Sequence, residues 1–203
     1  MQFDRAKLKA VILYTCQKCE AAQLGATKLN KVLYFADMLH YAHVGTSITG
    51  STYRKQPFGP TNDRLLSTLA ELKRQGAIDI RNVDYFGFIK KEYIEVESPE
   101  IDRLSKIEQE LLDAVIEFVC VNNSAKTISE FSHNRAWEIA EFGAVLPYNS
   151  VFSIFPTQVS PEALDWAAGE VEKLEAEGSL KDTMGGVTFA DFRSRVLEAR
   201  RGR

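Results

Sequence analysis

Residues 27–43, TKLNKVLYFADMLHYAH, predict a long α-helix at the centre of the fold. With 3.6 residues per turn, its apolar side chains share one face and extend sideways from it, which is typical of a helix in a core. The side chains that we expect to be buried are Leu29, Val32, Leu33, Ala36, His40 and His43, with Phe35 and Leu39 beside them. We expect Thr27 to cap the helix at its N-terminus and Gly45 to end it.

A different face of this helix is polar and aromatic. Helical spacing places four such side chains roughly 120° from the apolar centre: Asn30, Tyr34, Asp37 and Tyr41. Buried polar groups are nearly always hydrogen-bonded, so this face needs a hydrogen-bonding partner.

Part of the same helix carries a family resemblance. Residues 28–36, KLNKVLYFA, resemble the K-L-Q-K-L-L-Y-Y-A signature of the Panacea domain, a family of SocA-like antitoxins first described as phage-associated proteins. Two further segments lie where that family has motifs: residues 58–60, FGP, ahead of a leucine-rich helix, and residues 128–133, ISEFSH, followed by Trp137. The resemblance extends over about residues 5–155.

The resemblance implies an antitoxin: a non-enzymatic protein, without a cofactor, that binds a cognate protein toxin and holds it inactive. In some members it also implies presentation of the toxin to a protease. We expect the toxin to contact the polar face of the helix and the loop of residues 45–60, because Tyr, Arg and Phe are enriched at interfaces. The expected partner-binding residues are Asn30, Tyr34, Asp37, Tyr53, Arg54 and Phe58. For the loop itself, the sequence favours a packed corner over a binding surface, since Gly59 and Pro60 specify a tight bend and Gly-Pro turns are common.

The composition is that of an ordinary globular chain, with 203 residues of which 45% are apolar and 26% charged. No apolar run approaches the roughly 20 residues of a membrane-spanning helix. The charged N-terminal stretch MQFDRAKLKA lacks the apolar region of a secretory signal, and three cysteines argue against a disulfide framework. We therefore expect a cytoplasmic protein with no membrane partner. The net charge of −3 gives no general attraction to nucleic acid.

Two pairs of possible metal ligands lie on predicted helices. Cys16 and Cys19 belong to a first helix over residues 4–21, and His40 and His43 to the second. Zinc binds four N or S ligands in a tetrahedron, which two such pairs can supply in principle. The spacing differs from that of zinc fingers, and all four residues lie on or beside apolar stripes, where cysteine behaves as a small hydrophobe. We expect core positions and no metal, and zinc remains the alternative.

A leucine-rich helix follows the loop, and an antiparallel element follows the helix. We expect Thr61 or Asn62 to cap this helix and Gly76 to end it. Its predicted apolar stripe comprises Leu65, Leu66, Leu69 and Leu72. Alternating apolar residues between 78 and 96 predict a β-hairpin or meander. Helix and hairpin also outline a winged helix, so a DNA-binding regulator is the alternative function. Acidic residues lie between the basic residues of this helix and hairpin, so a basic stripe for DNA is not evident. We therefore expect nucleic acid as a partner only if the protein regulates its own expression.

The remaining residues predict further helices and no catalytic site. Residues 105–108, SKIE, match a capping box that begins a helix. Its predicted buried face comprises Ile107, Leu111, Val115 (or Leu112), Phe118 and Val119. We expect the ring of His133 to hydrogen-bond to a nearby carbonyl or carboxylate. No phosphate-binding loop, G-x-S-x-G or H-E-x-x-H motif is present, so we expect no enzyme.

These patterns together predict a mainly α fold with a small antiparallel β-hairpin or meander. We expect one Panacea-like helical domain over residues 1–157 and a helical C-terminal extension over residues 158–203. The extension contains an acidic stretch over 161–177 and an Arg-rich end, and the sequence assigns no role to either.

Overall fold

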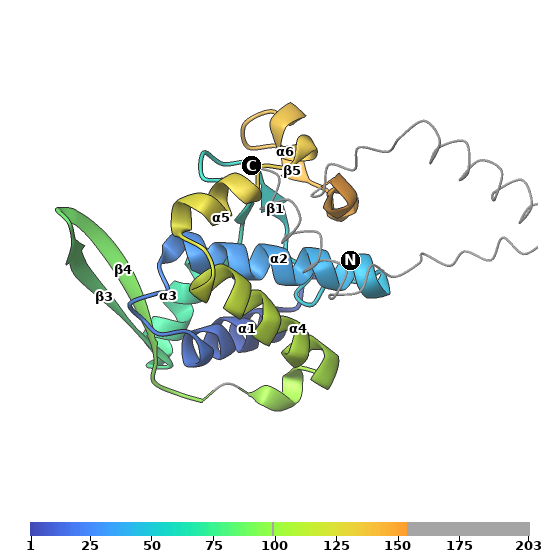
Figure 1. Cartoon of the computed structure of the whole chain (residues 1–203). Helices are drawn as coiled ribbons and strands as arrows, with labels where there is room; N and C mark the ends of the chain where they lie inside the picture. Colours follow the sequence, from blue (N-terminus) through green and yellow to red (C-terminus); the bar gives the residue numbers. More distant parts are fainter. Residues whose placement is uncertain (99, 154–203) are drawn as a thin grey trace, which may run out of the picture. The chain divides into compact units, whose positions relative to one another are not determined.

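In the computed structural model, which describes residues 1–98 and 100–153, helix α2 (Ala26–Val44) lies at the centre of the described elements (Figure 1). Thirteen of its 19 residues are buried, so the helix is enclosed on all sides rather than on one face. Gly45 ends it in a left-handed conformation with a φ of 75°, as predicted. The predicted cap is wrong, because the helix begins one residue before Thr27 and its N-cap is Gly25. The predicted burial of His43 is also wrong, because the last turn of the helix reaches solvent.

Elements from both ends of the described chain cover α2. Helix α1 (Arg5–Lys18) begins at Asp4, whose carboxylate accepts a hydrogen bond from the backbone N–H of Lys7. Among the other elements that contact α2 are α4 (Lys106–Ile116), α5 (Ala125–Phe131) and the 3-10 helix η3 (Tyr148–Ser153). Together with α2 they form a helical core, which confirms the predicted mainly α fold.

Helix α4 begins with the predicted capping box. The hydroxyl of Ser105 accepts from the backbone N–H of Glu108, and the Glu108 carboxylate accepts from the backbone N–H of Ser105. The predicted buried face is wrong at Ile107, which is exposed because the face turned inward is centred on Leu112 and Val115. The helix continues into a π-helical turn, η2 (Glu117–Val121).

A three-stranded sheet ties the loop after α2 to the end of the described chain. Strand β1 (Tyr53–Arg54) pairs antiparallel with β2 (Thr61–Asn62) and with β5 (Val145–Leu146). The predicted caps of the next helix, Thr61 and Asn62, therefore belong to a strand. Helix α3 (Leu65–Gln75) begins after Arg64 and ends at Gly76, as predicted for its C-terminus.

The predicted hairpin is present as β3 (Ile78–Tyr85) and β4 (Phe88–Glu95). Phe86 and Gly87 form the connecting turn with φ values of 52° and 82°, the left-handed pair of a type I′ turn. The hairpin is buried only at its base, and its other end projects away from the helices (Figure 1).

The remaining described elements are short: η1 (Ile101–Arg103) before α4, and α6 (Arg135–Ile139) before β5. None of the helices in residues 1–98 and 100–153 has the length and apolar character needed to span a bilayer. The predicted C-terminal extension, residues 158–203, lies outside the described residues, so its helices and its boundary at residue 157 remain predictions.

Candidate partner-binding site

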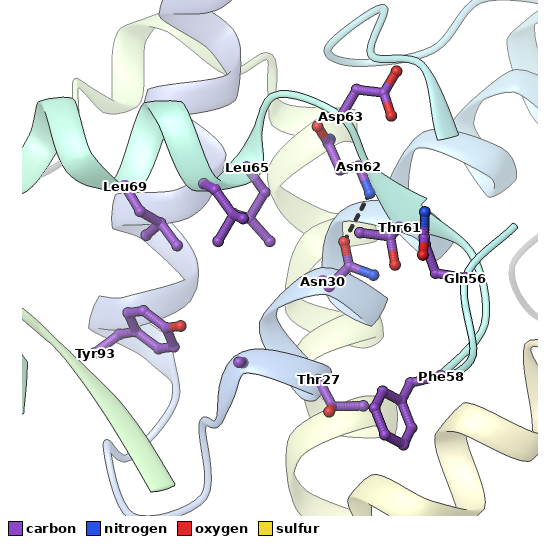
Figure 2. A pocket seen from close by; sticks show the side chains of 12 residues that line it. Thr27, Asn30, Gln56, Phe58, Thr61, Asn62, Asp63, Leu65, Leu69 and Tyr93 are labelled. Atoms are coloured by element: carbon purple, nitrogen blue, oxygen red, sulfur yellow. Dashed lines mark hydrogen bonds between the residues drawn. The ribbon is translucent and has the colours of Figure 1, made fainter. Parts of the chain in front are cut away.

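The first two sequence motifs meet at the backbone carbonyl of Pro60. The side-chain N–H of Asn30 donates to this carbonyl at 2.6 Å, and Nζ of Lys31 donates to it at 3.1 Å. The side-chain oxygen of Asn30 accepts from the backbone N–H of Asn62 at 2.9 Å (Figure 2). One asparagine therefore satisfies backbone groups on both sides of Thr61, and it binds the loop to α2.

The third motif holds the same loop from the other side. The hydroxyl of Ser129 on α5 donates to the carbonyl of Phe58 at 2.9 Å. Gly59 has a φ of 89°, and a Cβ at this position would lie 2.5 Å from Nζ of Lys31 and closer still to Oγ of Ser132. Only glycine fits both this backbone conformation and this close approach. The three motifs thus form one joint between α2, the loop and α5.

The polar face of α2 finds its hydrogen-bonding partners inside the chain. Asp37 is fully buried, and its carboxylate accepts from the backbone N–H of Thr49 at 2.8 Å, the Thr49 hydroxyl at 2.5 Å and the Tyr53 hydroxyl at 2.8 Å. Burial raises the pKa of Asp37, while these hydrogen bonds act in the opposite direction. Tyr34 is also buried, with its ring edge-on to that of Tyr53 at 5.4 Å.

The structure does not place the six expected partner-binding residues on one surface. Four of them are buried, namely Asn30, Tyr34, Asp37 and Tyr53. Arg54 is half-buried, and its guanidinium pairs with Asp63 at 2.8 Å and donates to the carbonyl of Gly143 at 3.0 Å. Phe58 is 72% exposed, although the backbone on both of its sides is fixed. Of the six side chains, Phe58 is therefore the one best placed to contact a partner.

A groove beside Phe58 makes this residue part of a larger surface. It has a volume of about 360 Å³ and lies between the start of α2, the loop, α3 and β4. Leu65, Leu69 and Tyr93 supply apolar walls, and Asn30 and Asn62 lie across from them (Figure 2). The groove therefore combines apolar walls with a few fixed polar groups, the combination typical of binding sites.

Sequence reasoning missed the position of Leu66 at this groove. The side chain was expected in the buried stripe of its helix, but it is 77% exposed and lines the groove. Leu65, Leu69 and Leu72 already fill the buried stripe, and Leu66 lies one position outside it. An apolar residue next to a complete stripe was the signal available in the sequence.

A buried lysine lies behind the loop. Lys31 is completely buried, and burial lowers its pKa to about 7. His133 stacks on Trp137 with 3.6 Å between ring centroids and an angle of 5°. In the described part of the chain, Nε2 of His133 has no hydrogen-bond partner, so the predicted bond to a carbonyl or carboxylate does not form at this nitrogen. Burial and the nearby lysines lower the pKa of His133.

The four possible zinc ligands do not lie together as a metal site. Cys16 and Cys19 are buried free thiols, and Nδ1 of His40 lies 2.6 Å from the carbonyl oxygen of Thr46. His43 is exposed. Within residues 1–98 and 100–153, no three His, Cys, Asp or Glu side chains are grouped so as to hold a metal ion.

Helix α3 and the β3–β4 hairpin resemble a winged helix, but basic side chains of the hairpin are paired with acidic ones. On the hairpin, Arg81 pairs with Asp79 at 2.9 Å and Lys90 pairs with Glu92 at 3.1 Å. Basic side chains that are already paired attract DNA phosphates less strongly than a stripe of unpaired basic side chains does. In the described residues, nothing favours nucleic-acid binding over protein binding.

Comparison with known proteins gives one match. A sequence model of the family described as "Antitoxin SocA-like, Panacea domain" matches residues 29–138, more than half of the chain. The matched segment includes most of α2, the loop with Phe58, the hairpin, and the motif on α5. No curated protein and no solved structure matches the chain.

Proposed function

The chain belongs to the Panacea-domain family of SocA-like antitoxins, and from this premise we propose that it neutralises a cognate protein toxin by binding it directly at the groove between α2 and α3. The role is one of binding rather than catalysis. We expect the pair to act in the cytoplasm.

The single observation that carries this proposal is the position of Phe58. Its side chain is exposed, yet hydrogen bonds from Ser129 to its own carbonyl and from Asn30 to that of Pro60 fix the backbone around it. An exposed aromatic on a fixed backbone loses little backbone entropy on binding, and large aromatic anchors dominate the energy of many interfaces. Phe58 at the edge of an apolar groove is therefore a preorganised anchor for a partner.

We assign the buried residues of the polar face a positioning role. Asn30 holds the loop beside Phe58, and Asp37 with Tyr53 holds the preceding part of the loop against α2. Substitutions at these positions reduce toxin binding through the shape of the loop, whereas substitutions at Phe58 or Leu66 remove contacts with the toxin. The two effects differ experimentally, because only the first also lowers the stability of the free protein.

Neutralisation by occlusion and neutralisation by presentation to a protease make different predictions. Occlusion requires only the complex and leaves the amount of toxin unchanged. Presentation shortens the lifetime of the toxin whenever the antitoxin is present. We propose occlusion as the basic mechanism, and the toxin half-life with and without the antitoxin tests whether degradation accompanies it.

The test uses growth after induction of the neighbouring gene, alone and together with this chain, in a host that lacks both. We expect the neighbour to arrest growth and the wild-type chain to restore it. Leu66→Asp places a charge at the groove and is expected to abolish rescue. Ile139→Asp is the matched control, because Ile139 is 70% exposed on α6 and does not line the groove.

Two results would count against the proposal. If the neighbour arrests growth and the expressed, folded wild-type chain fails to rescue, the antitoxin function for this pair is wrong. If Leu66→Asp rescues as well as the wild type, the function stands and the groove is not the binding site. Both variants are checked for their thermal midpoint, so that loss of folding is not mistaken for loss of contact.

A further inference from the structure

The end of the β3–β4 hairpin is an exposed apolar cluster that folding does not explain. It consists of Tyr85, Phe86, Phe88 and Ile89, here called the tip cluster, whose members are between 55% and 86% exposed. Single exposed apolar residues are common on proteins, but contiguous clusters of large ones mark interaction sites. The hairpin is anchored at the opposite end, where Ile78 and Tyr93 are buried.

The turn holds the tip cluster in a defined shape. Phe86 has a φ of 52°, a left-handed conformation that a non-glycine residue rarely adopts, and Gly87 follows with 82°. The carboxylate of Asp84 accepts from the backbone N–H of Gly87 at 3.2 Å. The rings of Tyr85 and Phe86 meet edge-on with 4.9 Å between centroids. Asparagine or glycine would satisfy this turn more easily, so the phenylalanine is not there for the turn.

The tip cluster has large apolar side chains on both faces of the ribbon: Tyr85 and Phe88 on one face, and Ile89 beside Asp84 on the other. Tyr85 pairs with Phe88 and Asp84 pairs with Ile89, and adjacent pairs in an antiparallel ladder point to opposite faces. A flat partner surface covers only one face of such a ribbon. A partner that buries both faces must surround the tip with a cleft.

The charges beside the tip cluster define the rim of that cleft. Lys90 and Lys91 follow the cluster directly; Lys90 is already paired with Glu92, so Lys91 supplies the available positive charge at this end of the ribbon. Lys91 is exposed, and no acidic side chain of the described residues pairs with it. An acidic rim on the partner complements this charge.

The strand that carries the tip also reaches the groove. Tyr93 on β4 lines the groove, and Phe88 lies five residues earlier on the same strand. At a rise of about 3.3 Å per residue, the two positions are roughly 17 Å apart, a distance that one small protein spans. One partner can therefore occupy the groove and enclose the tip.

We propose that the hairpin tip inserts into an apolar, acid-rimmed cleft of the same toxin that the groove binds. This inference rests on the proposed antitoxin function and adds a second contact to it. The groove provides a surface onto which the toxin docks, and the tip cluster provides a projection that enters the toxin.

The test measures the dissociation constant of the full chain with the purified toxin by titration calorimetry. Phe86→Asn is the informative variant, because asparagine tolerates the left-handed conformation and keeps the turn. We expect this variant to bind at least 10-fold more weakly and Phe86→Asn/Phe88→Thr to bind more weakly still. Lys91→Glu is expected to weaken binding several-fold and to reduce its dependence on salt. Ile139→Thr, at an exposed apolar site outside the hairpin, is the control and should bind like the wild type.

The outcomes separate this inference from the proposed function. Wild-type affinity in Phe86→Asn and in the double variant, with wild-type rescue of growth, overturns the inference and leaves the antitoxin function intact. Failure of the wild-type chain to bind the toxin overturns both. Two further measurements address other occupants of the tip: sedimentation of the free chain, and its flotation with vesicles of anionic phospholipid. Self-association or vesicle binding that requires Phe86, with unchanged toxin affinity, also overturns the inference.

Discussion

The side chain of Asn30 binds the backbone of Asn62, 32 positions further along the chain, with 2.9 Å between the side-chain oxygen and the backbone nitrogen. The side-chain nitrogen of Asn30 donates to the carbonyl of Pro60. Both the oxygen and the nitrogen of this side-chain amide therefore join the loop to α2. Asn30, Pro60 and Asn62 are all buried.

Asn30→Ala should therefore destabilise the protein by about 1–3 kcal/mol, the usual cost of leaving a buried polar group without its partner. The free energy of unfolding in urea measures this effect. Asn82→Ala is the matched control on the exposed face of the hairpin, where a change within about 0.5 kcal/mol is expected. Equal stability of the two variants would show that the Asn30 bonds do not hold the loop.

Gly59→Ala should be more damaging than the same change at another left-handed glycine. Gly59 and Gly45 have φ values of 89° and 75°, so alanine is strained at both. A Cβ at Gly45 meets nothing within 4 Å, whereas at Gly59 it collides with Lys31 and Ser132. We expect Gly45→Ala to cost about 1 kcal/mol from backbone strain, and Gly59→Ala to cost more than 2 kcal/mol. Similar melting temperatures for both variants would contradict the close approach.

Lys31 should make stability rise with pH above neutrality. Its pKa in the folded protein is about 7, against 10.5 for an ordinary lysine, so between these values the unfolded chain binds more protons than the folded one. The free energy of unfolding then increases as pH rises through this window, and the cost of the buried charge is fully present below pH 7.

Lys31→Met removes the titrating group and keeps most of the volume. The variant should be more stable than the wild type at pH 6, by roughly 1–3 kcal/mol, and the difference should shrink towards pH 9.5. Urea unfolding at pH 6, 8 and 9.5 measures it, with Asn30 still bonded to Pro60 in both proteins. A difference that stays constant or grows with pH would mean that Lys31 is charged in the folded protein.

Phe58→Ser should weaken toxin binding by roughly 30-fold or more, the loss expected when an anchor worth about 2 kcal/mol is removed. Phe142→Ser is the control, because Phe142 is similarly exposed but does not line the groove. Titration of both variants with the purified toxin, alongside their thermal midpoints, separates contact from stability. Equal affinities of Phe58→Ser and Phe142→Ser for the toxin would show that Phe58 does not contact it.

Local patterns were sufficient to predict most of the secondary structure. Helix α2 follows from its periodicity, Gly45 and Gly76 end the helices that precede them, and the Ser105–Glu108 box begins α4. These features depend on residues within one or two turns of each other. The alternation predicted a hairpin or meander, whereas the position of its two-residue turn at Phe86 and Gly87 came only from the structure.

What lies opposite a helical face was not predictable in this way. The polar face of α2 was correctly expected to need partners, but Asp37 finds them in Thr49 and Tyr53, within a loop without regular period. Periodicity tells which residues share a face and not which part of the chain covers it. For this reason Phe58 was correctly expected at the surface, whereas Tyr34 and Asp37 were expected at an interface and lie in the core.

The enclosure of α2 also dictates when the nascent chain can fold. Its covering elements extend from α1 to η3, so the helix is synthesised roughly a hundred residues before the last of these elements, η3, has been made. At the usual pace of synthesis this delay lasts on the order of 5 to 20 s. During that interval a helix that folding will bury is available to chaperones and proteases, and chains that stop short of η3 lack part of its cover.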